Sequence, residues 1–455
     1  MGKYFGTDGV RGVAGADLTC EMAMLIGRGA AAVLTSSTGH KPRILIGKDT
    51  RQSGDMLEAA LTAGLCSVGA DVESLGVVPT PAVAYLVRKY NADAGVVISA
   101  SHNPMEFNGI KIFAGTGYKL PDEVENKIEA YIDNQCAGLK LATGDDVGRV
   151  TCCTDGIKDY TDHLYESING DLSGLNICID CANGASAAVA RQLFPRLGAK
   201  CTFIGVEPDG KNINAGVGST HLDNLEKAVV EGGFDCGIAF DGDADRCLAC
   251  DEKGQEIDGD KVIALLAMNM KEKGCLDGNT AVVTVMSNLG FIKFMESQGI
   301  RTEKTAVGDR YVLENMRENG YAIGGEQSGH VILLHHATTG DGELTALQFL
   351  QALRRSGKQA SELASCCPQY PQELINVAVS HVPGVKDAIM QDPALRHAIA
   401  QMEQELAGKG RVLIRPSGTE ALIRVMVEAK TTEVARKVAE DLADLIKILS
   451  EKIQF

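Results

Sequence analysis

The chain has 455 residues, more than one ordinary hydrophobic core can hold, so we expect three or four domains. Hydrophobic residues make up 45% of the chain and charged residues 23%, a composition typical of a globular protein. The formal net charge of -16 argues against nucleic acid or an anionic membrane surface as the principal partner, since both select basic surfaces. No apolar run is long enough to cross a bilayer, and the opening MGKYFGTDG does not look like a signal peptide, so we expect a cytoplasmic location.

Short aliphatic strands alternate with amphipathic helices along much of the chain. Strands are predicted at residues 42–49, 70–77 and 93–101, with helices at 53–68 and 81–90 between them. The same alternation returns from Asn176 and again from Thr280. Repeated units of this kind predict mainly parallel sheets with helices on both faces, and ligands then bind beyond the carboxyl ends of the strands.

Three turn-rich segments, at residues 142–149, 251–260 and 365–373, suggest domain boundaries. The predicted domains are, in chain order, residues 1–150, 151–254, 255–368 and 373–455. We expect an α/β protein of three successive α/β domains with mixed, mainly parallel sheets, followed by a smaller C-terminal α+β domain.

The fourteen cysteines include two Cys-x-x-Cys pairs, which can indicate a metal or redox site. Cys178 with Cys181 and Cys247 with Cys250 each lie in or beside a strand-like run, where residues three apart face opposite sides of a sheet. We therefore expect buried structural thiols rather than metal ligands.

The most specific chemical signal is the motif FDGDADR. Asp241, Asp243 and Asp245 alternate with small residues, so a tight loop can turn three carboxylates inward. Anionic oxygen ligands suit a hard cation such as Mg²⁺. The spacing also resembles an EF-hand loop with Glu252 in twelfth position, but Arg246 stands where that loop has glycine and both flanks read as strands. A Mg²⁺ loop is the favoured interpretation.

A buried strand leads into ISASHNP, which presents Ser101 followed by His102. Ser101 is a candidate nucleophile, although the segment lacks the G-x-S-x-G elbow of hydrolases. Taken alone, it is more simply a serine that caps a turn before Asn-Pro. Lys111, ten residues further on, is either a cation of the same site or a solvated lysine beside a strand.

Two further loops combine glycine with polar side chains. GGEQSGH presents Glu326, Ser328 and His330, a set suited to reading sugar hydroxyls and moving a proton near neutral pH. RPSGTEALIR offers hydroxyls, backbone N–H groups and the guanidinium groups of Arg415 and Arg424, which suit a phosphate, although S-G-T is also common turn chemistry.

The motifs T-D-G-V-R-G, S-A-S-H-N-P, D-G-D-A-D-R, G-E-Q-S-G-H and R-P-S-G-T-E occur in this order between Phe5 and about Val427. The series resembles the α-D-phosphohexomutase superfamily, which implies four domains around a central cleft. Within it, YFGTDGVRG, GEQSGH and TTGDGELTALQ look most like the bacterial branch that interconverts glucosamine 6-phosphate and glucosamine 1-phosphate for cell-wall precursors. The alternative is a phosphoglucomutase or phosphomannomutase that acts on neutral hexose phosphates.

The resemblance implies a role for each matching residue. Ser101 would carry a phosphoryl group, and one Mg²⁺ would be bound by Asp241, Asp243, Asp245 and a phosphate oxygen on Ser101. The other residues expected around the reacting phosphate, with Lys111 and His330 as the proton carriers, are Arg11, His102, Lys111, Arg246 and His330. The residues that the resemblance implies for holding the sugar or its second phosphate are Glu326, Ser328, Arg415, Ser417, Gly418, Thr419 and Arg424. Asp309 and Arg310, in the segment VGDRYV, are further candidates for substrate binding from their residue types.

The implied reaction transfers the phosphoryl group of phosphoserine to a monophosphate, which gives a sugar 1,6-bisphosphate that turns around before returning its other phosphate to Ser101. The expected partner is a small phosphosugar, with no nucleic acid and no membrane; a homodimer stays open. Two positions depart from the usual pattern: Ala244 stands where glycine is common and Ala421 where proline often follows. Alanine at position 244 matters only if its φ is positive.

Two interpretations from other classes leave motifs unexplained. A serine hydrolase built on Ser101 would not need three aspartates or an arginine-rich loop. A calcium-regulated binding protein would need EF-hand helices that the pattern does not predict.

Overall fold

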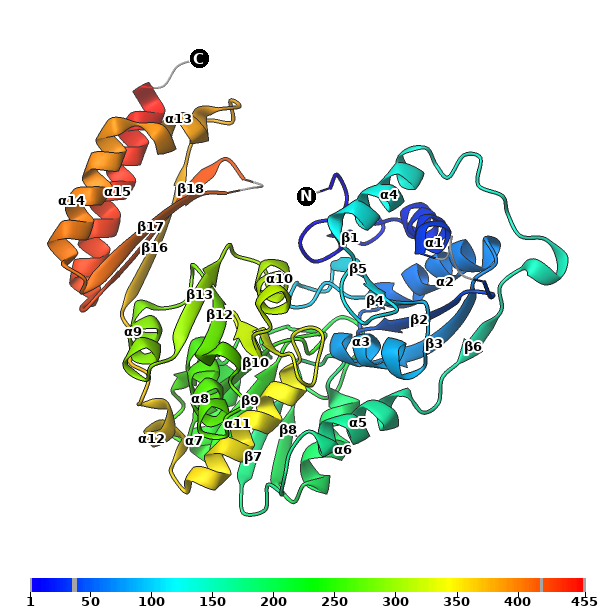
Figure 1. Cartoon of the computed structure of the whole chain (residues 1–455), viewed down its shortest axis with the longest axis horizontal. Helices are drawn as coiled ribbons and strands as arrows, with labels where there is room; N and C mark the ends of the chain where they lie inside the picture. Colours follow the sequence, from blue (N-terminus) through cyan, green and yellow to red (C-terminus); the bar gives the residue numbers. More distant parts are fainter. Residues whose placement is uncertain (1, 35–38, 418–419, 453–455) are drawn as a thin grey trace. The chain divides into compact units, whose positions relative to one another are not determined.

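The computed structural model describes residues 2–34, 39–417 and 420–452 (Figure 1). The chain forms two compact units. The first contains Met1–Met286 and Gln298–Cys366, and the second contains Ser287–Ser297 and Cys367–Phe455. None of the described helices is both long enough and apolar enough to cross a membrane.

The N-terminal part of the first unit is built on a six-stranded sheet in the order β1-β5-β4-β2-β3-β6. The strands β2, β3, β4 and β6 run parallel, whereas β5 is antiparallel to both of its neighbours. The elements are β1 (Val10–Val13), α1 (Cys20–Leu34), β2 (Arg43–Lys48), α2 (Ser53–Ser67), β3 (Asp71–Val77), α3 (Thr80–Lys89), β4 (Ala94–Ile98), β5 (Phe107–Ala114), α4 (Asp122–Asp133), a 3₁₀ turn (Gly144–Asp146) and β6 (Val150–Cys152).

Helices cover both faces of this sheet, as alternating strand residues require. Ile44 and Ile46 of β2 point into a buried cluster that also contains Leu57 and Leu61 of α2. On the opposite face, Gly47 lies against Val83 of α3, where a Cβ on the glycine would overlap the valine side chain. The missing side chain thus lets α3 pack directly on the strands.

The middle of the first unit carries a five-stranded sheet in the order β11-β10-β9-β7-β8, in which β7, β8 and β9 are parallel and β10 and β11 antiparallel. Its elements are α5 (Gly156–Glu166), β7 (Asn176–Asp180), α6 (Ala187–Arg196), β8 (Lys200–Ile204), α7 (Asp223–Gly232), β9 (Cys236–Phe240), β10 (Cys247–Asp251) and β11 (Glu256–Ile257).

A four-stranded sheet follows in the order β13-β12-β14-β15, parallel except for β15. Its elements within the first unit are α8 (Gly259–Glu272), a 3₁₀ turn (Asp277–Asn279), β12 (Thr280–Thr284), β13 (Arg301–Thr305), α10 (Asp309–Asn319), β14 (Ile323–Gly325), β15 (Val331–Leu333), α11 (Gly342–Ser356) and α12 (Ala360–Ala364).

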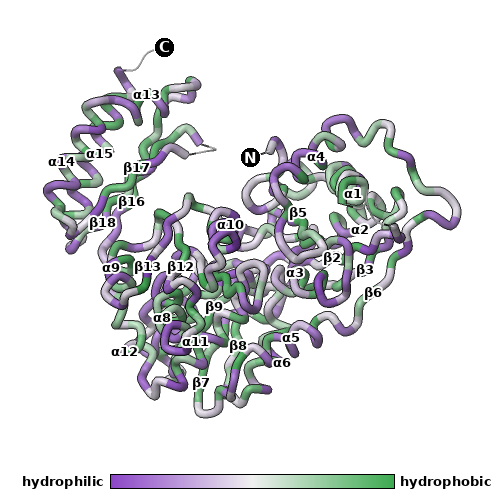
Figure 2. The backbone as a smooth tube through the Cα atoms, viewed as in Figure 1, coloured by the Kyte–Doolittle hydropathy of each residue, from purple (hydrophilic) through white to green (hydrophobic). Residues whose placement is uncertain are grey.

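The second unit is a three-stranded antiparallel sheet, β16-β18-β17, with helices. Its elements are α9 (Leu289–Ser297), β16 (Gln372–Ala378), α13 (Val385–Gln391), α14 (Pro393–Leu406), β17 (Gly410–Pro416), β18 (Leu422–Ala429) and α15 (Thr432–Lys452). Hydrophobic and hydrophilic residues alternate along α15 (Figure 2), and most of its apolar residues, such as Leu442 and Ile446, are buried, whereas Val434 and Ile448 are exposed. The predicted fold class, α/β with a smaller C-terminal α+β domain, is confirmed.

The cysteines of the two Cys-x-x-Cys pairs are free and buried. Burial raises the pKa of the Cys178 thiol to about 11 and that of Cys250 to about 12, so these thiols stay protonated. Among the described residues, the one group that could hold a metal ion contains no cysteine.

Candidate active site

The candidate residues lie where strands of the first unit end or pair. Ser101 follows β4, the three aspartates of FDGDADR follow β9, and residues 326–330 follow β14. Lys111 lies on β5 and Arg11 on the adjacent β1, where Arg11 pairs with Gly109. Most of these motifs therefore stand beyond the carboxyl ends of strands, where α/β sheets bind ligands.

The Ser101 side chain meets the first aspartate of the trio. Ser101 is 1% exposed, and its Oγ donates a hydrogen bond to Asp241 Oδ2 at 2.6 Å. His102 Nδ1 lies 3.3 Å from the same Oγ. Burial, with the positive charges of Arg246 and Arg11, lowers the pKa of His102 to about 4, so its ring is neutral at neutral pH. The hydroxyl thus faces one carboxylate and one uncharged imidazole.

Buried polar side chains hold the Ser101 loop in an unusual backbone conformation. Ser101 has a φ of 54°, in the left-handed region that L-residues other than glycine disfavour. Arg51 is 2% exposed, and its guanidinium donates to the backbone oxygens of four loop residues, Ser101, Asn103, Pro104 and Phe107. Its Nε also donates to Asp49 Oδ2 at 2.9 Å. This guanidinium, together with Asn214 Nδ2, which also donates to the Ser101 and Asn103 oxygens, holds the loop that presents the hydroxyl.

The three aspartates form a compact buried group. Asp241, Asp243 and Asp245 are 0%, 0% and 3% exposed, and one ligand oxygen from each lies within 4.8 Å of the others. Ala244 between them has a φ of 57°, so its departure from glycine does matter: this conformation costs alanine roughly 1 kcal/mol. Thr80 Oγ1 donates to Asp243 Oδ2 at 2.6 Å and ties the loop to the start of α3.

The trio suits a hard divalent cation. Burial and the negative charges of Asp245 and Asp243 raise the pKa of Asp241 to about 8, which indicates that positive charge is short at this point. Asp243 Oδ1 and Asp245 Oδ1 are buried and have no hydrogen-bond partner among the described residues. Anionic oxygens of this kind are the ligands that a hard divalent cation prefers. The trio can therefore hold a metal ion.

Lys111 supplies a fixed positive charge on the other side of the trio. It is 1% exposed, and its Nζ lies 2.8 Å from Asp243 Oδ2, 3.3 Å from Asp245 Oδ2 and 3.0 Å from Asp8 Oδ2. Burial alone would lower its pKa, but the negative charges of Asp243, Asp8 and Asp245 raise it well above its ordinary value. Lys111 is therefore a buried cation.

Asp8 continues the ionic network toward α10. It pairs with Arg11 and, through Oδ1, with Lys119 Nζ at 2.5 Å. Lys119 Nζ also lies 2.5 Å from Asp309 Oδ2. Burial would raise the pKa of Asp8, but Lys111, Lys119 and Arg11 hold it well below its usual range. The network thus links β1, β5 and α10 through alternating charges.

His330 connects this ionic network to the aspartate trio. It is 3% exposed, with Nδ1 3.6 Å from Asp245 Oδ1 and Nε2 3.5 Å from Asp309 Oδ2. The backbone N–H of Gly340 donates to Nε2 at 3.1 Å, so the proton of the neutral ring lies on Nδ1. Burial alone would lower the pKa of His330, but Asp245 and Asp309 raise it overall. His330 can therefore exchange a proton beside the trio.

Four family models match the chain in order along its length. They are described as phosphoglucomutase/phosphomannomutase α/β/α domains I, II and III and the C-terminal domain, and they match residues 2–137, 158–254, 258–370 and 374–445. The chain belongs to the phosphoglucomutase/phosphomannomutase family. Membership of this family makes it a mutase, and therefore an isomerase, and confirms the resemblance seen in the motifs.

Two curated relatives indicate which branch of the family this chain is similar to. The chain is 53% identical over 453 residues to the phosphoglucosamine mutase of Acetivibrio thermocellus, covering 100% of both chains. It is 56% identical over 449 residues to the phosphoglucosamine mutase of Caldicellulosiruptor bescii, covering 98% of this chain and 99% of the relative. These proteins belong to the bacterial branch that the motifs resemble most.

Solved structures of the family share the fold. A phosphoglucomutase/phosphomannomutase family protein from Burkholderia thailandensis matches with a TM-score of 0.80 and 22% identity, over 99% of this chain and 98% of that one. An N-acetylphosphoglucosamine mutase from Aspergillus fumigatus, in complex with GlcNAc-6P and magnesium, matches with a TM-score of 0.69 and 17% identity, over 98% and 96%.

The remaining candidates of the first unit differ in the contacts that they make. The backbone N–H of Arg246 donates to Asp241 Oδ1 at 3.2 Å. Glu326 Oε1 accepts from the backbone N–H of Gly308 at 3.1 Å, and Ser328 is exposed at the tip of its loop.

Arg310 is engaged elsewhere in the first unit. Its guanidinium pairs with Asp122 and Glu125 of α4, the latter at 2.9 Å, and not with the trio. An arginine held by two carboxylates is less available to a phosphate than a free one. The structure therefore does not bring Arg310 together with the other candidates, and its role in substrate binding stays a prediction.

The C-terminal candidates belong to the second unit. Arg415 on β17 and Arg424 on β18 are directly paired across the sheet, and burial with the charge of Arg424 lowers the pKa of Arg415. Arg424 also pairs with Glu420 at 3.1 Å, and the Ser417 backbone oxygen accepts from Lys386 Nζ at 2.5 Å. Gly418 and Thr419 lie outside the described residues.

Sequence reasoning missed five residues that hold the site together, namely Asp8, Asp49, Arg51, Thr80 and Lys119. Asp8 stands inside the T-D-G-V-R-G motif, beside the Arg11 that was selected. Asp49 ends a predicted strand and Arg51 follows it closely, and polar residues at that position are a usable signal. Thr80 and Lys119 carry no local signal, because their partners are more than one hundred residues away.

Proposed function

We propose that this mutase interconverts glucosamine 6-phosphate and glucosamine 1-phosphate through a phosphorylated Ser101 and a sugar 1,6-bisphosphate. The observation that carries the proposal is the 2.6 Å hydrogen bond from Ser101 Oγ to Asp241 Oδ2, because it joins the one candidate donor hydroxyl to a carboxylate trio suited to a metal. The choice of an amino sugar is supported by relatives that are phosphoglucosamine mutases, at 53% and 56% identity.

Mg²⁺ is the metal we propose for Asp241, Asp243 and Asp245; when bound there, it would neutralise charge that develops on the phosphoryl oxygens. Lys111 and Arg11 would place fixed positive charges beside the same group, which lowers the cost of its transfer. His330, buried with Nδ1 3.6 Å from Asp245 Oδ1, is the proposed carrier of the sugar hydroxyl proton.

The roles of the other candidate residues, the domain boundaries, the location and the oligomeric state are also proposals. Glu326 and Ser328 would hold the sugar, and the loop that begins at Arg415 would hold the phosphate that is not reacting. The four domains keep the boundaries 1–150, 151–254, 255–368 and 373–455. A cytoplasmic location and a homodimer remain predictions.

The Ser101→Ala variant tests the phosphoserine. Removal of the nucleophile is expected to lower kcat on the order of 10⁴-fold or more. Intact mass spectrometry should find one phosphoryl group, removable by phosphatase, on the wild type and none on this variant. Ser328→Ala is the matched control, which should keep the phosphoryl group. Near-normal turnover by Ser101→Ala would rule out the proposed mechanism.

A comparison of rates tests the substrate. We expect kcat/KM for glucosamine 1-phosphate to exceed that for glucose 1-phosphate under the same magnesium concentration. A preference for glucose 1-phosphate would instead support the alternative, a phosphoglucomutase or phosphomannomutase acting on neutral hexose phosphates, and would leave the Ser101 chemistry intact.

A further inference from the structure

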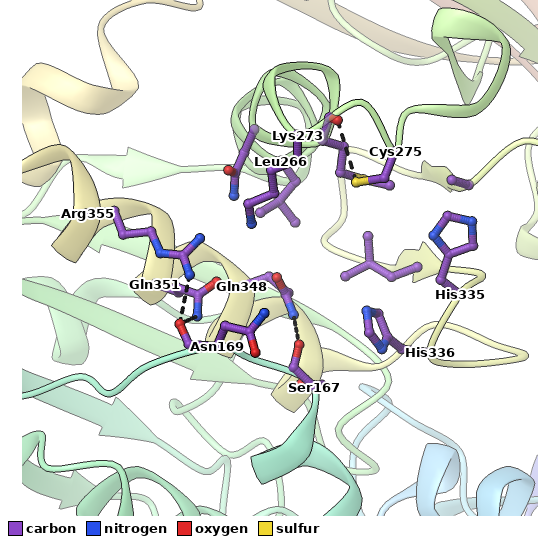
Figure 3. A pocket seen from close by; sticks show the side chains of 14 residues that line it. Ser167, Asn169, Leu266, Lys273, Cys275, His335, His336, Gln348, Gln351 and Arg355 are labelled. Carbon is purple, nitrogen blue, oxygen red and sulfur yellow. Dashed lines mark hydrogen bonds between the residues drawn. The ribbon is translucent and has the colours of Figure 1, made fainter.

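A cavity of about 260 Å³ lies in the first unit, and none of the candidate active-site residues lines it. Its walls come from the segment after α5, the C-terminal half of α8, the β14–β15 hairpin with the loop that follows, and α11. Figure 3 shows Arg355 and Gln351 on one side of the cavity and His335 and His336 on the other. Residues far apart in the sequence thus build a single pocket, at whose rim Lys273, His335 and Arg355 are exposed.

The two full charges in the lining of this cavity, on Lys273 and Arg355, are both positive, and the Asp277 carboxylate, which pairs with His335 at 2.9 Å, lies outside the lining. Its lining contains Lys273, Arg355, His335 and His336 but no carboxylate, although the whole chain has 60 acidic and only 44 basic residues. The other polar lining residues are mainly amides and a serine hydroxyl. In so acidic a chain, a cavity without a single acidic side chain points to an anionic ligand.

The two full cations of the lining lack counter-charges. Among the described residues, none forms an ion pair with Lys273 or Arg355; Arg355 Nη2 donates to the Asn169 backbone oxygen at 2.7 Å. Burial and the nearby charge of Arg355 lower the pKa of Lys273, as expected for two like charges beside one cavity. A bound anion would relieve that repulsion.

The remaining lining distinguishes between classes of anion. Gln348 and Gln351 use their amide N–H groups to hold the backbone oxygens of Ser167 and Asn169, which leaves their Oε1 atoms as acceptors for ligand hydroxyls. Burial and the neighbouring His335 lower the pKa of His336, so its ring is neutral and can donate or accept. Leu266 and Leu333 form apolar parts of the wall. The cavity is therefore suited to a molecule with both a charged and an uncharged part.

We propose that this cavity is a second ligand site of the protein, distinct from the candidate active site, and that it binds a small phosphate monoester. A phosphate monoester carries about −1.5 to −2 charges near neutral pH, which matches Lys273 and Arg355 together, whereas a single carboxylate matches only one of them. The planar guanidinium of Arg355 can bind two phosphate oxygens at once. The volume of about 260 Å³ lies just below the usual range for small-molecule pockets, about 300–1,000 Å³, and so suits a small metabolite.

Histidine NMR tests the site directly, because the imidazoles in the lining report on it and His102 and His330 report on the active site in the same spectrum. The probes are inorganic phosphate and glycerol 2-phosphate, titrated at constant ionic strength and at a constant pH well above the ordinary imidazole pKa. The His335 and His336 signals, assigned with His335→Gln and His336→Gln, are expected to shift saturably with both probes. Acetate at the same concentrations is expected to leave them unchanged.

Charge variants complete the test. In Lys273→Ala/Arg355→Ala, the dissociation constant read from His335 and His336 is expected to rise about tenfold or more. Lys271→Ala removes one positive charge from the last turn of α8, two residues before Lys273, but Lys271 does not line the cavity and donates to the Gln298 backbone oxygen, so the affinity should stay as in the wild type. Signals that do not move with phosphate, or that move equally in the double variant or with acetate, would overturn the proposal. The NMR readout does not depend on mutase activity. The proposal of a second ligand site can therefore fail while the proposed function holds, and the reverse.

Discussion

At the scale of single residues, the Ser101 loop depends on one buried guanidinium. Arg51 donates to four backbone oxygens of that loop and pairs with Asp49, and both side chains are almost fully buried. Arg51→Met keeps much of the volume but removes the guanidinium donor from these oxygens and the buried positive charge that pairs with Asp49. We expect it to lower the free energy of unfolding by about 3–5 kcal/mol, the cost of breaking a buried ion pair, in a urea titration followed by circular dichroism.

The same variant should lower kcat more than it raises KM, because Arg51 positions the hydroxyl and does not touch the substrate. Arg396→Met on α14 is the matched control, since Arg396 is exposed and should change stability by less than about 0.5 kcal/mol. A stable Arg51→Met enzyme with normal kcat would show that the loop holds its shape without the guanidinium.

Site residues that lie within a recognisable motif could be predicted from the sequence. Site residues that join the site only through partners far away in the sequence could not. Ser101, Lys111 and the aspartate trio were selected as candidates, and they do lie together in the structure. Lys119 could not be found in this way, because it joins the site through a contact with Asp309, which is 190 residues away in the sequence. Arg310 was selected for its type, yet it pairs with α4.

At the scale of elements, the N-terminus of α11 holds a buried acid. Asp341 is 2% exposed; its Oδ1 caps the helix by accepting from Leu344 N at 2.9 Å, and its Oδ2 accepts from Tyr160 OH at 2.8 Å. Burial raises its pKa from the ordinary 3.8 to about 6. Between these values the folded chain holds a proton that the unfolded chain releases. The free energy of unfolding should therefore rise as the pH falls from about 6 to about 4. This contribution of Asp341 is lost as the pH rises through about 6.

Asp341→Asn isolates this effect, because asparagine is an equally good N-cap but does not titrate. We expect the wild type to gain on the order of 3 kcal/mol over that pH range relative to the variant, measured as the difference between their urea midpoints at each pH. The same substitution at Asp392, the half-buried N-cap of α14, should preserve the wild-type profile. Parallel profiles for Asp341→Asn and the wild type would show that Asp341 is not the titrating group.

At the scale of the whole molecule, the class of the fold could be predicted because each α/β block repeats the same local pattern. Strand periodicity and short polar segments are local signals, and they indicated parallel sheets and a smaller C-terminal α+β region. Membership of a compact unit is not local. Residues 287–297, including α9, belong to the unit of the C-terminal sheet, although about seventy residues of the first unit separate them from it in sequence. No periodicity in α9 itself reveals that association.

One buried carboxylate joins α9 to the C-terminal sheet. Glu428 of β18 is fully buried; its Oε2 accepts from Leu289 N at 2.9 Å and from Arg411 Nε at 2.7 Å. Arg411 in turn donates to the Ser287 backbone oxygen at 2.6 Å. Donors converge on both carboxylate oxygens of Glu428. In Glu428→Gln, the amide N–H₂ would therefore face one of these donors, and that donor would lose its hydrogen bond.

We therefore expect Glu428→Gln to loosen α9, with amide hydrogen exchange in residues 289–297 faster by roughly tenfold to a hundredfold, the range for losing one hydrogen bond to a charged group. Exchange in the strands β4 and β9 of the first unit should not change. Glu373→Gln is the matched control, because Glu373 on β16 pairs with the exposed Arg436 at 3.2 Å and such surface pairs contribute little. If α9 exchanged at the wild-type rate in Glu428→Gln, or if the control accelerated it equally, then apolar packing and not the buried carboxylate would be what holds this helix to the C-terminal sheet.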